Sequence, residues 1–316
     1  MSSNADAVVV GAGVIGLTTG ICLAEAGVGT RILAAEPPRR TTSYAAGAIC
    51  GPVFLSLDDP DGAREHASYA AFTELASVPG SGVHMCEGRF VAPTVMPAAP
   101  TIYRPDDVRL LTADELPPGY ASGFAATVPC VDMPRYLDYL SGRFQDAGGI
   151  VEIRRLSALS EAAQTAPLVA NCTGVGARDL VPDPAVRAVR GQHVVVENPG
   201  IDTVFMEPPV GAAWTGWHPH GDVVVLGGVA VEDDWNLDPD PAVAEQILRR
   251  CIAVEPRFQD AGIVEHRVGL RPGRPTVRLE REDLGGTRIV HDYGHGGTGV
   301  MLSWACAREA AALLTT

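Results

Sequence analysis

The sequence contains no lysine, so all 24 basic residues of the 316-residue chain are arginines. Without a lysine amine, no Schiff base can form with a pyridoxal cofactor or with a carbonyl substrate. A phosphate-binding loop ending in Gly-Lys-Ser/Thr is also excluded, and with it that type of ATP or GTP hydrolysis. Positive charge at a functional site must therefore come from arginine, histidine, a helix N-terminus or a metal ion.

Basic residues are also few, since 24 of them face 38 aspartates and glutamates and the formal net charge is -14. This balance argues against nucleic acid and anionic membranes as partners, because both attract clustered cations. The seven cysteines are never spaced Cys-x-x-Cys, which indicates neither a disulfide framework nor a zinc site. The uncharged stretch from Ala7 to Ala24 contains four glycines and follows Asp6, unlike a secretory signal with a basic flank. We expect a soluble cytoplasmic protein without a metal.

A glycine-rich turn near the N-terminus joins a predicted strand to a predicted helix. The apolar run Ala7–Val10 leads into Gly11-Ala-Gly-Val-Ile-Gly16, and residues 17–26 read as a helix. A second predicted strand over residues 31–35 ends at Glu36, about 20 residues after the last glycine of the motif. This order of strand, glycine turn, helix, strand and acid is typical of a dinucleotide-binding fold.

Each glycine of this turn has a distinct expected role. Gly11 permits the tight turn, Gly13 lets the backbone approach a pyrophosphate, and Gly16 lets the helix pack closely on the strand. The helix N-terminus offers free N–H groups to the phosphates. Glu36 is placed to bind a ribose hydroxyl, which disfavours NADP but leaves NAD and FAD open.

Two further segments lie in the C-terminal third. Residues 269–280 hold Arg271, Arg274 and Arg278 beside two prolines that stiffen the backbone, and a rigid arginine can hold a carboxylate through two hydrogen bonds. Residues 289–299 then form a glycine-rich turn that opens a predicted helix, with its N-terminus aimed at an anionic or electron-rich group. The histidines in that turn lack a third ligand, so no metal site is predicted.

Together these motifs resemble the D-amino-acid oxidase family of FAD-dependent enzymes, over essentially the whole chain. The resemblance rests on residues 11–16, 41–47, 171–175, 189–192, 269–280 and 291–299. It implies an α/β protein with a Rossmann-type FAD-binding domain and an interleaved antiparallel β-sheet substrate domain. We place the FAD-binding domain in residues 1–75, 131–185 and 289–316, and the substrate domain in residues 76–130 and 186–288.

The resemblance also implies roles for individual residues. Arg271 would bind the substrate carboxylate, and the Gly297 carbonyl would accept a hydrogen bond from the substrate amine. The family's substrate-facing tyrosine is missing from residues 214–221, so we predict that Trp214 or Trp217 replaces it. The predicted FAD-binding residues are Gly11, Ala12, Gly13, Val14, Ile15, Gly16, Glu36, Thr41, Thr42, Ser43, Ala46, Gly47, Val175, Gly296, Gly297, Thr298, Gly299 and Val300.

The implied activity is oxidative deamination of a D-amino acid. A hydride passes to FAD, O₂ is reduced to hydrogen peroxide, and the imino acid hydrolyses to a 2-oxo acid and ammonia. We expect neutral or apolar substrates, because an oxidase of D-aspartate or D-glutamate needs a second cation and only His218 and His220 are candidates. Glycine oxidase, an NAD-linked dehydrogenase and a non-catalytic flavin-binding module stay open as alternatives, as does a homodimer.

Overall fold

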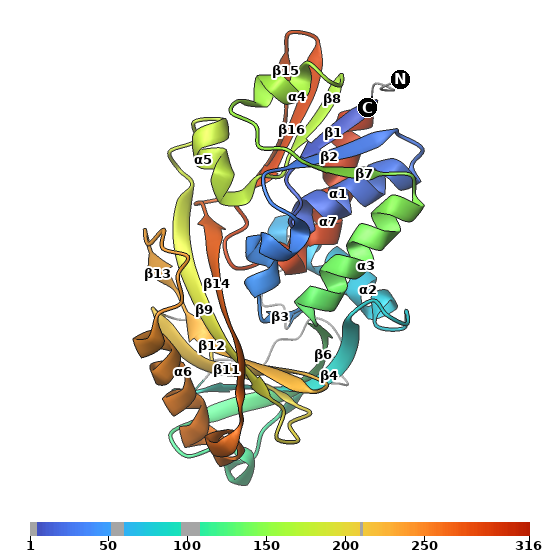
Figure 1. The fold of residues 1–316 in the computed structure, drawn as a ribbon. Helices are drawn as coiled ribbons and strands as arrows, with labels where there is room; N and C mark the ends of the chain where they lie inside the picture. Colours follow the sequence, from blue (N-terminus) through green and yellow to red (C-terminus); the bar gives the residue numbers. More distant parts are fainter. Residues whose placement is uncertain (1–4, 52–59, 96–107, 209–210) are drawn as a thin grey trace.

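Two β-sheets organise the computed structural model, which describes residues 5–51, 60–95, 108–208 and 211–316. The smaller sheet and its helices fill the upper half of Figure 1, and the larger sheet fills the lower half. Two long strands, β9 and β14, extend from the lower half toward the upper half. Both chain ends lie together at the top of this view.

The smaller sheet has six strands in the order β15-β16-β8-β1-β2-β7. Its strands are β1 (Ala7–Val10), β2 (Thr30–Ala34), β7 (Ile150–Ile153), β8 (Leu168–Asn171), β15 (Arg278–Leu284) and β16 (Thr287–Tyr293). Five of them run parallel, and β15 pairs with β16 in the antiparallel direction. Parallel strands joined through helices are the arrangement that the glycine turn predicts.

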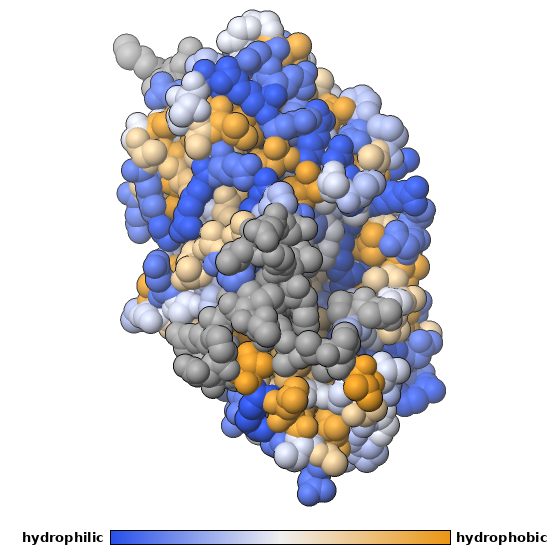
Figure 2. All heavy atoms as spheres, turned by 180° about the vertical axis from the view of Figure 1, so that it is seen from behind, coloured by the Kyte–Doolittle hydropathy of each residue, from blue (hydrophilic) through white to orange (hydrophobic). Residues whose placement is uncertain are grey.

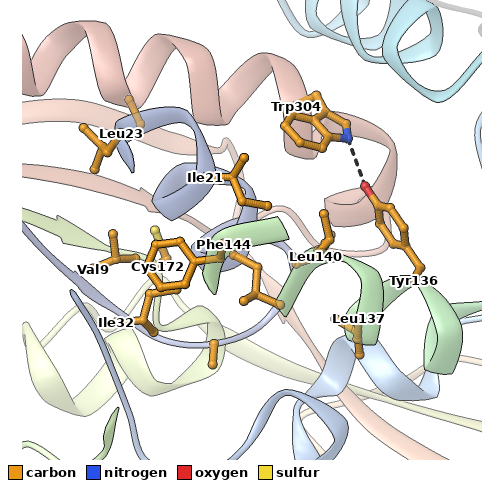
Figure 3. Close-up of a cluster of buried hydrophobic side chains, with 14 of the residues drawn as sticks. Val9, Ile21, Leu23, Ile32, Tyr136, Leu137, Leu140, Phe144, Cys172 and Trp304 are labelled. Carbon is orange, nitrogen blue, oxygen red and sulfur yellow. Dashed lines mark hydrogen bonds between the residues drawn. The ribbon is translucent and has the colours of Figure 1, made fainter. Parts of the chain in front are cut away.

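Helices cover both faces of this sheet because β1 is apolar on both sides. Val9 packs on one side against α1 (Val14–Glu25), α3 (Met133–Asp146) and α7 (Gly299–Thr315), and Val8 packs on the other against α4 (Leu159–Ala163). Figure 3 shows the first of these clusters, in which the Trp304 indole N–H donates to the Tyr136 hydroxyl at 2.9 Å. Each large side chain buried here contributes about 1.5–3 kcal/mol.

The larger sheet follows the order β13-β9-β12-β11-β10-β4-β6-β3, with β14 added to β9 and β5 added to β6. Its strands are β3 (Ala48–Ile49), β4 (Val83–Ala92), β5 (Arg109–Leu110), β6 (Ser122–Val131), β9 (Arg187–Glu197), β10 (Val204–Met206), β11 (Ala213–His220), β12 (Val223–Val229), β13 (Val231–Glu232) and β14 (Ile263–Gly273). All of its pairs are antiparallel except β4 with β10. A second apolar cluster joins its outer face to α6 (Pro241–Val254).

The remaining helices are short or connect the two sheets. They are α2 (Pro60–Leu75), α5 (Ala177–Leu180) and the 3₁₀ turns η1 (Pro38–Arg40), η2 (Thr42–Ala45), η3 (Ala113–Glu115), η4 (Gly174–Gly176) and η5 (Pro256–Asp260). None of the helices in the described ranges is both long and apolar enough to cross a membrane. Figure 2 shows hydrophilic and hydrophobic residues interspersed over the described part of the rear face.

The α/β fold with two sheets confirms the predicted fold class. The sheets differ from the predicted domain limits at two strands. β3 belongs to the larger sheet although residues 1–75 were placed in the FAD-binding domain, and β15 belongs to the six-stranded sheet although residues 186–288 were placed in the substrate domain. For β15 the reason is local: Gly285 and Gly286 adopt φ values of 58° and 89° and turn β15 directly into β16, so the two strands pair as a hairpin. The division into domains itself stays a prediction.

Candidate active site

A cavity of about 530 Å³ is lined by residues of both sheets. Its walls come from the β1–α1 turn, the end of β2, η2, η4, strands β9 and β14, and the turn between β16 and α7. Segments from distant parts of the sequence therefore meet at one place. The predicted site residues that line the cavity are Gly11, Ala12, Gly13, Val14, Ile15, Glu36, Thr41, Thr42, Ser43, Ala46, Val175, Arg271, Gly296, Gly297, Gly299 and Val300.

Three predicted cofactor-binding residues are not among the residues that line the cavity. A Cβ added to Gly16 would lie 1.9 Å from the Gly11 carbonyl oxygen, so Gly16 allows close packing behind the turn. A Cβ on Gly47 would lie 2.8 Å from the His218 ring. Thr298 precedes α7, and its hydroxyl donates to the His295 carbonyl at 2.8 Å. The cofactor contacts of these three residues stay predictions.

The two predicted tryptophans have different surroundings. Trp217 is 5% exposed, stacks on Phe205 with ring centroids 4.3 Å apart and belongs to the cluster beneath α6. It is therefore a core residue, and the prediction that it contacts substrate needs correcting. The β11–β12 register shifts between Ala213 and Gly216, in the stretch that holds Trp214. Trp214 instead lies beside Arg271, whose guanidinium is 5.6 Å from its ring.

The β1–α1 turn exposes a helix N-terminus to the cavity. Gly11 has a φ of 111°, and an added Cβ would lie 2.4 Å from the Cys172 carbonyl oxygen. Gly13 precedes α1 without a side-chain cap, and the first turn of the helix holds no acidic residue. The Val14 N–H donates to the Ser43 hydroxyl at 3.0 Å. Such an end carries partial positive charge and suits a phosphate.

A second helix N-terminus opens on the same cavity at α7. The residue before it, Thr298, makes no side-chain cap, and the first turn lacks acidic residues. Gly299 and Val300 of this turn line the cavity. Two helix ends therefore direct partial positive charge into one cavity, which compensates for the absence of lysine. At another end of the lining, Glu36 accepts a hydrogen bond from Arg155 at 3.3 Å.

Arg271 is the predicted substrate ligand, and β14 carries it into the cavity. Its guanidinium packs on Gly191, where an added Cβ would lie 2.5 Å from Nη1, and donates to the Val229 carbonyl at 2.9 Å. Within the described residues it forms no ion pair, and burial lowers its pKa. Arg274 and Arg278 instead pair with Asp183 and Glu280. One of the three arginines is thus left to bind an external anion.

Sequence reasoning missed His193, which lines the cavity from β9. The imidazole is 7% exposed, and its Nδ1 lies 2.8 Å from the Ala45 carbonyl oxygen. Burial, with the nearby Arg271 charge, lowers the pKa of His193 to about 3. No local motif marks His193, because its place in the cavity depends on the pairing of β9 with β14 and on the contact with Ala45.

Other histidines on the larger sheet are also held neutral. Burial lowers the pKa of His218 to about 4 and that of His220 to about 2, and it lowers the pKa of His84 as well. A histidine whose pKa lies this low carries no charge at pH 7. His218 and His220 therefore do not supply the second cation that an acidic substrate side chain requires.

A buried polar pair lies where β16 meets α7. Asp292 and His295 line the cavity, and the Asp292 carboxylate is 3.3 Å from His295 Nε2. Neither carboxylate oxygen has a hydrogen-bond partner within the described ranges. Cys306 completes a group whose ligand-type atoms lie within 4.8 Å of one another, and His84, Cys130 and His220 form a similar group. The absence of a metal stays a prediction.

The fold and the cavity define a dinucleotide-binding oxidoreductase. A family model described as "DAO: FAD dependent oxidoreductase" matches residues 6–313, and the chain belongs to this family, the D-amino-acid oxidase family. A D-amino-acid oxidase from Rubrobacter xylanophilus is 46% identical over 98% of this chain and 95% of that relative. One from Streptomyces coelicolor is 45% identical over 98% and 97%. The human D-aspartate oxidase is 34% identical over 97% and 94%.

Solved structures agree on the fold. Glycine oxidase from Geobacillus kaustophilus superposes with a TM-score of 0.83, at 20% identity and over 98% of this chain and 94% of that one. The residues present fit FAD: a Cβ would fill the glycine turn that approaches the pyrophosphate, and two uncapped helix ends face the cavity. The protein is thus an FAD-dependent enzyme, which confirms the predicted cofactor and excludes the non-catalytic and NAD-linked alternatives.

Proposed function

We propose that this enzyme oxidises neutral D-amino acids to 2-oxo acids and ammonia, with O₂ as the electron acceptor and hydrogen peroxide as the second product. The single observation that supports this proposal is Arg271, a half-buried cation that lines the cavity and forms no ion pair among the described residues. Desolvation of a guanidinium without an anion is costly and lowers the pKa of Arg271, so this position suits an incoming carboxylate. The relatives named D-amino-acid oxidase support the D configuration.

The chain's residues bind and orient the substrate. Bound FAD would supply the hydride acceptor and the path of two electrons to O₂. Arg271 holds the α-carboxylate through its planar fork, and the Gly297 carbonyl accepts from the amine. A Cβ on Gly297 would lie 3.8 Å from the Arg271 Cδ, so the two groups are adjacent. Fixing carboxylate and amine together sets which face the Cα–H presents, and orientation of this kind accelerates transfer.

The cofactor contacts follow from the two helix ends. The β1–α1 turn, with Ser43 beside it, would bind the pyrophosphate, and Glu36 would bind the ribose hydroxyls. The α7 N-terminus would lie against the pyrimidine end of the flavin, together with Gly296 and Thr298. Partial positive charge there stabilises negative charge on the reduced ring without a lysine.

A neutral side chain suits the described part of the cavity better than an acidic one. The arginines that line it besides Arg271 are Arg40, Arg154 and Arg155, and Arg155 pairs with Glu36. The nearby imidazoles stay neutral for the reason given above. A substrate carboxylate at this point would lack a partner, which costs several kcal/mol. A homodimer stays a prediction that size-exclusion chromatography checks.

The test is anaerobic titration of the purified holoenzyme with amino acids of both configurations. D-alanine, D-valine and D-methionine should bleach the visible flavin band, and admission of air should restore it with formation of peroxide. The L-enantiomers and D-aspartate should leave the spectrum of the oxidised enzyme unchanged. Equal bleaching by both enantiomers would contradict the stereochemical proposal, and stronger bleaching by D-aspartate would contradict the preference for neutral substrates.

A further inference from the structure

A hydrogen bond to the backbone determines which ring nitrogen of His193 carries the proton and which one is free to accept. Nδ1 lies 2.8 Å from the Ala45 carbonyl oxygen, and a carbonyl can only accept. Nδ1 must therefore carry the proton, which leaves a lone pair on Nε2. No hydrogen bond to Nε2 is present within the part of the chain that the structure describes. A buried acceptor beside a cavity needs a donor from whatever enters it.

His193 keeps this tautomer throughout the neutral range. Its pKa of about 3 is set first by burial and then by the charge of Arg271. A second proton on the ring would place two cations side by side without a counterion. The imidazole therefore presents an acceptor to the cavity at any pH at which the enzyme is expected to work.

The position of His193 relative to Arg271 decides which part of a substrate it meets. Gly297 lies beside the Cδ of Arg271, at the base of the guanidinium, whereas Gly191 lies against its far nitrogens. His193 is two residues beyond Gly191 on the same face of β9. A substrate with its carboxylate on Arg271 and its amine toward Gly297 thus directs its side chain toward His193.

The rings of His193 and Trp214 pack against two glycines that leave room for them. A Cβ on Gly227 would lie 2.0 Å from the His193 ring, and one on Gly228 would lie 2.8 Å from the ring of Trp214. His193 and Trp214 are thus neighbours above the Gly227–Gly228 segment of β12. They combine an apolar surface with a single acceptor.

We infer that Nε2 of His193 accepts a hydrogen bond from a hydroxyl or amide on the substrate side chain. The enzyme then favours a D-amino acid with such a donor over one of the same shape without it. This inference rests on the proposed function and narrows its substrate class. A side-chain carboxylate brings only lone pairs to this acceptor, so the same residue acts against acidic substrates.

The experiment compares matched substrates in the holoenzyme and in His193→Leu, which removes the acceptor at similar volume. The readout is kcat/KM for D-threonine relative to D-valine and for D-asparagine relative to D-leucine. Both ratios should fall about tenfold in the variant, since one hydrogen bond to a substrate is worth roughly this factor. His193→Gln, which keeps an acceptor, should recover part of the loss. His220→Leu removes a buried neutral imidazole that is not a lining residue and should leave both ratios unchanged.

The outcomes separate the two levels of the proposal. Ratios that stay within twofold in His193→Leu, while all four substrates are still oxidised, would overturn the role of His193 and leave the proposed function intact. If none of the four substrates reduces the flavin of the unmodified enzyme, the proposed function is wrong. A parallel fall for all substrates, with loss of bound FAD, would show that the ring only supports the backbone at Ala45. If His193→Leu does not fold, the smaller His193→Val takes its place with the same expected ratios.

Discussion

The two sheets line the cavity with different kinds of groups, one mainly with backbone and the other mainly with side chains. The six-stranded sheet contributes mainly backbone, at the ends of β1 and β16, where glycine turns open helices α1 and α7. The larger sheet contributes side chains, namely Arg271 and His193, which pack on glycines of neighbouring strands, and Trp214 lies beside Arg271 without lining the cavity. A backbone site depends on short contiguous motifs, whereas a side-chain site depends on strands that come together from distant parts of the chain. Substitutions should therefore act differently in the two halves.

The largest expected effect concerns the side-chain half. Arg271→Ala leaves a substrate carboxylate without its bidentate partner, and kcat/KM should fall about 10²–10³-fold, corresponding to roughly 3–4 kcal/mol. Steady-state peroxide release with D-alanine measures it. Arg281→Ala serves as the control, because Arg281 pairs with Asp283 on β15 and does not line the cavity. Kinetics of Arg271→Ala that match those of Arg281→Ala would refute the binding role.

Two tryptophans three residues apart should separate stability from catalysis. Trp217→Ala opens a hole in the cluster beneath α6 and should lower the free energy of unfolding by about 3–5 kcal/mol. Because Trp217 is remote from the cavity lining, the fraction that stays folded should keep its KM. Trp214→Ala should do the reverse, raising KM with a smaller loss of stability. Urea denaturation and kinetics on the same preparations test the pair; a larger KM change in Trp217→Ala would reverse our placement.

In the backbone half, a single methyl group should weaken cofactor binding. Gly11→Ala places a Cβ 2.4 Å from the Cys172 carbonyl oxygen at a φ of 111°, which costs roughly 1–2 kcal/mol in backbone strain alone and more from the contact. FAD affinity, measured by quenching of flavin fluorescence, should fall at least tenfold. Gly27→Ala has a positive φ of 84° but open space around it, so it should cost some stability and leave FAD affinity unchanged.

The buried histidines should make the larger sheet sensitive to acid. Because His220 has a pKa of about 2 in the folded protein against 6.5 for an ordinary histidine, the unfolded chain binds its proton first. The contribution of the neutral histidine to the free energy of unfolding is therefore fully present above about pH 6.5. It declines as the pH falls toward 2, by about 1.4 kcal/mol per pH unit for each such histidine. Between pH 7.5 and 5.5, His220→Leu should lose about 1.4 kcal/mol less than the unmodified protein in urea denaturation. An unchanged loss would show that His220 is protonated in the fold.

The difference between a backbone site and a side-chain site also explains which residues the sequence could predict. The glycine turn at Gly11, the helix after it and the turn before α7 are local, and their positions follow from residue order. Arg271 was accessible as well, because prolines and neighbouring arginines mark its segment. His193 was not, since its role depends on the pairing of β9 with β14 and on the contact with Ala45. Trp217 was misplaced because strand alternation puts residues three apart on opposite faces but does not show which face packs beneath α6.

The hydrogen bonds between η2 and β14 constrain where residues can be inserted in the chain. Thr42 holds both backbone groups of Leu270, accepting from its N–H at 3.3 Å and donating to its carbonyl at 3.0 Å. Arg271 is the next residue, and successive side chains of a strand point to opposite faces. One residue inserted between them would turn the guanidinium away from the cavity, whereas the exposed turn at Gly285 and Gly286 has open space around it. Insertions and deletions among descendants of this gene should thus collect at the hairpin tip and spare the Leu270–Arg271 step.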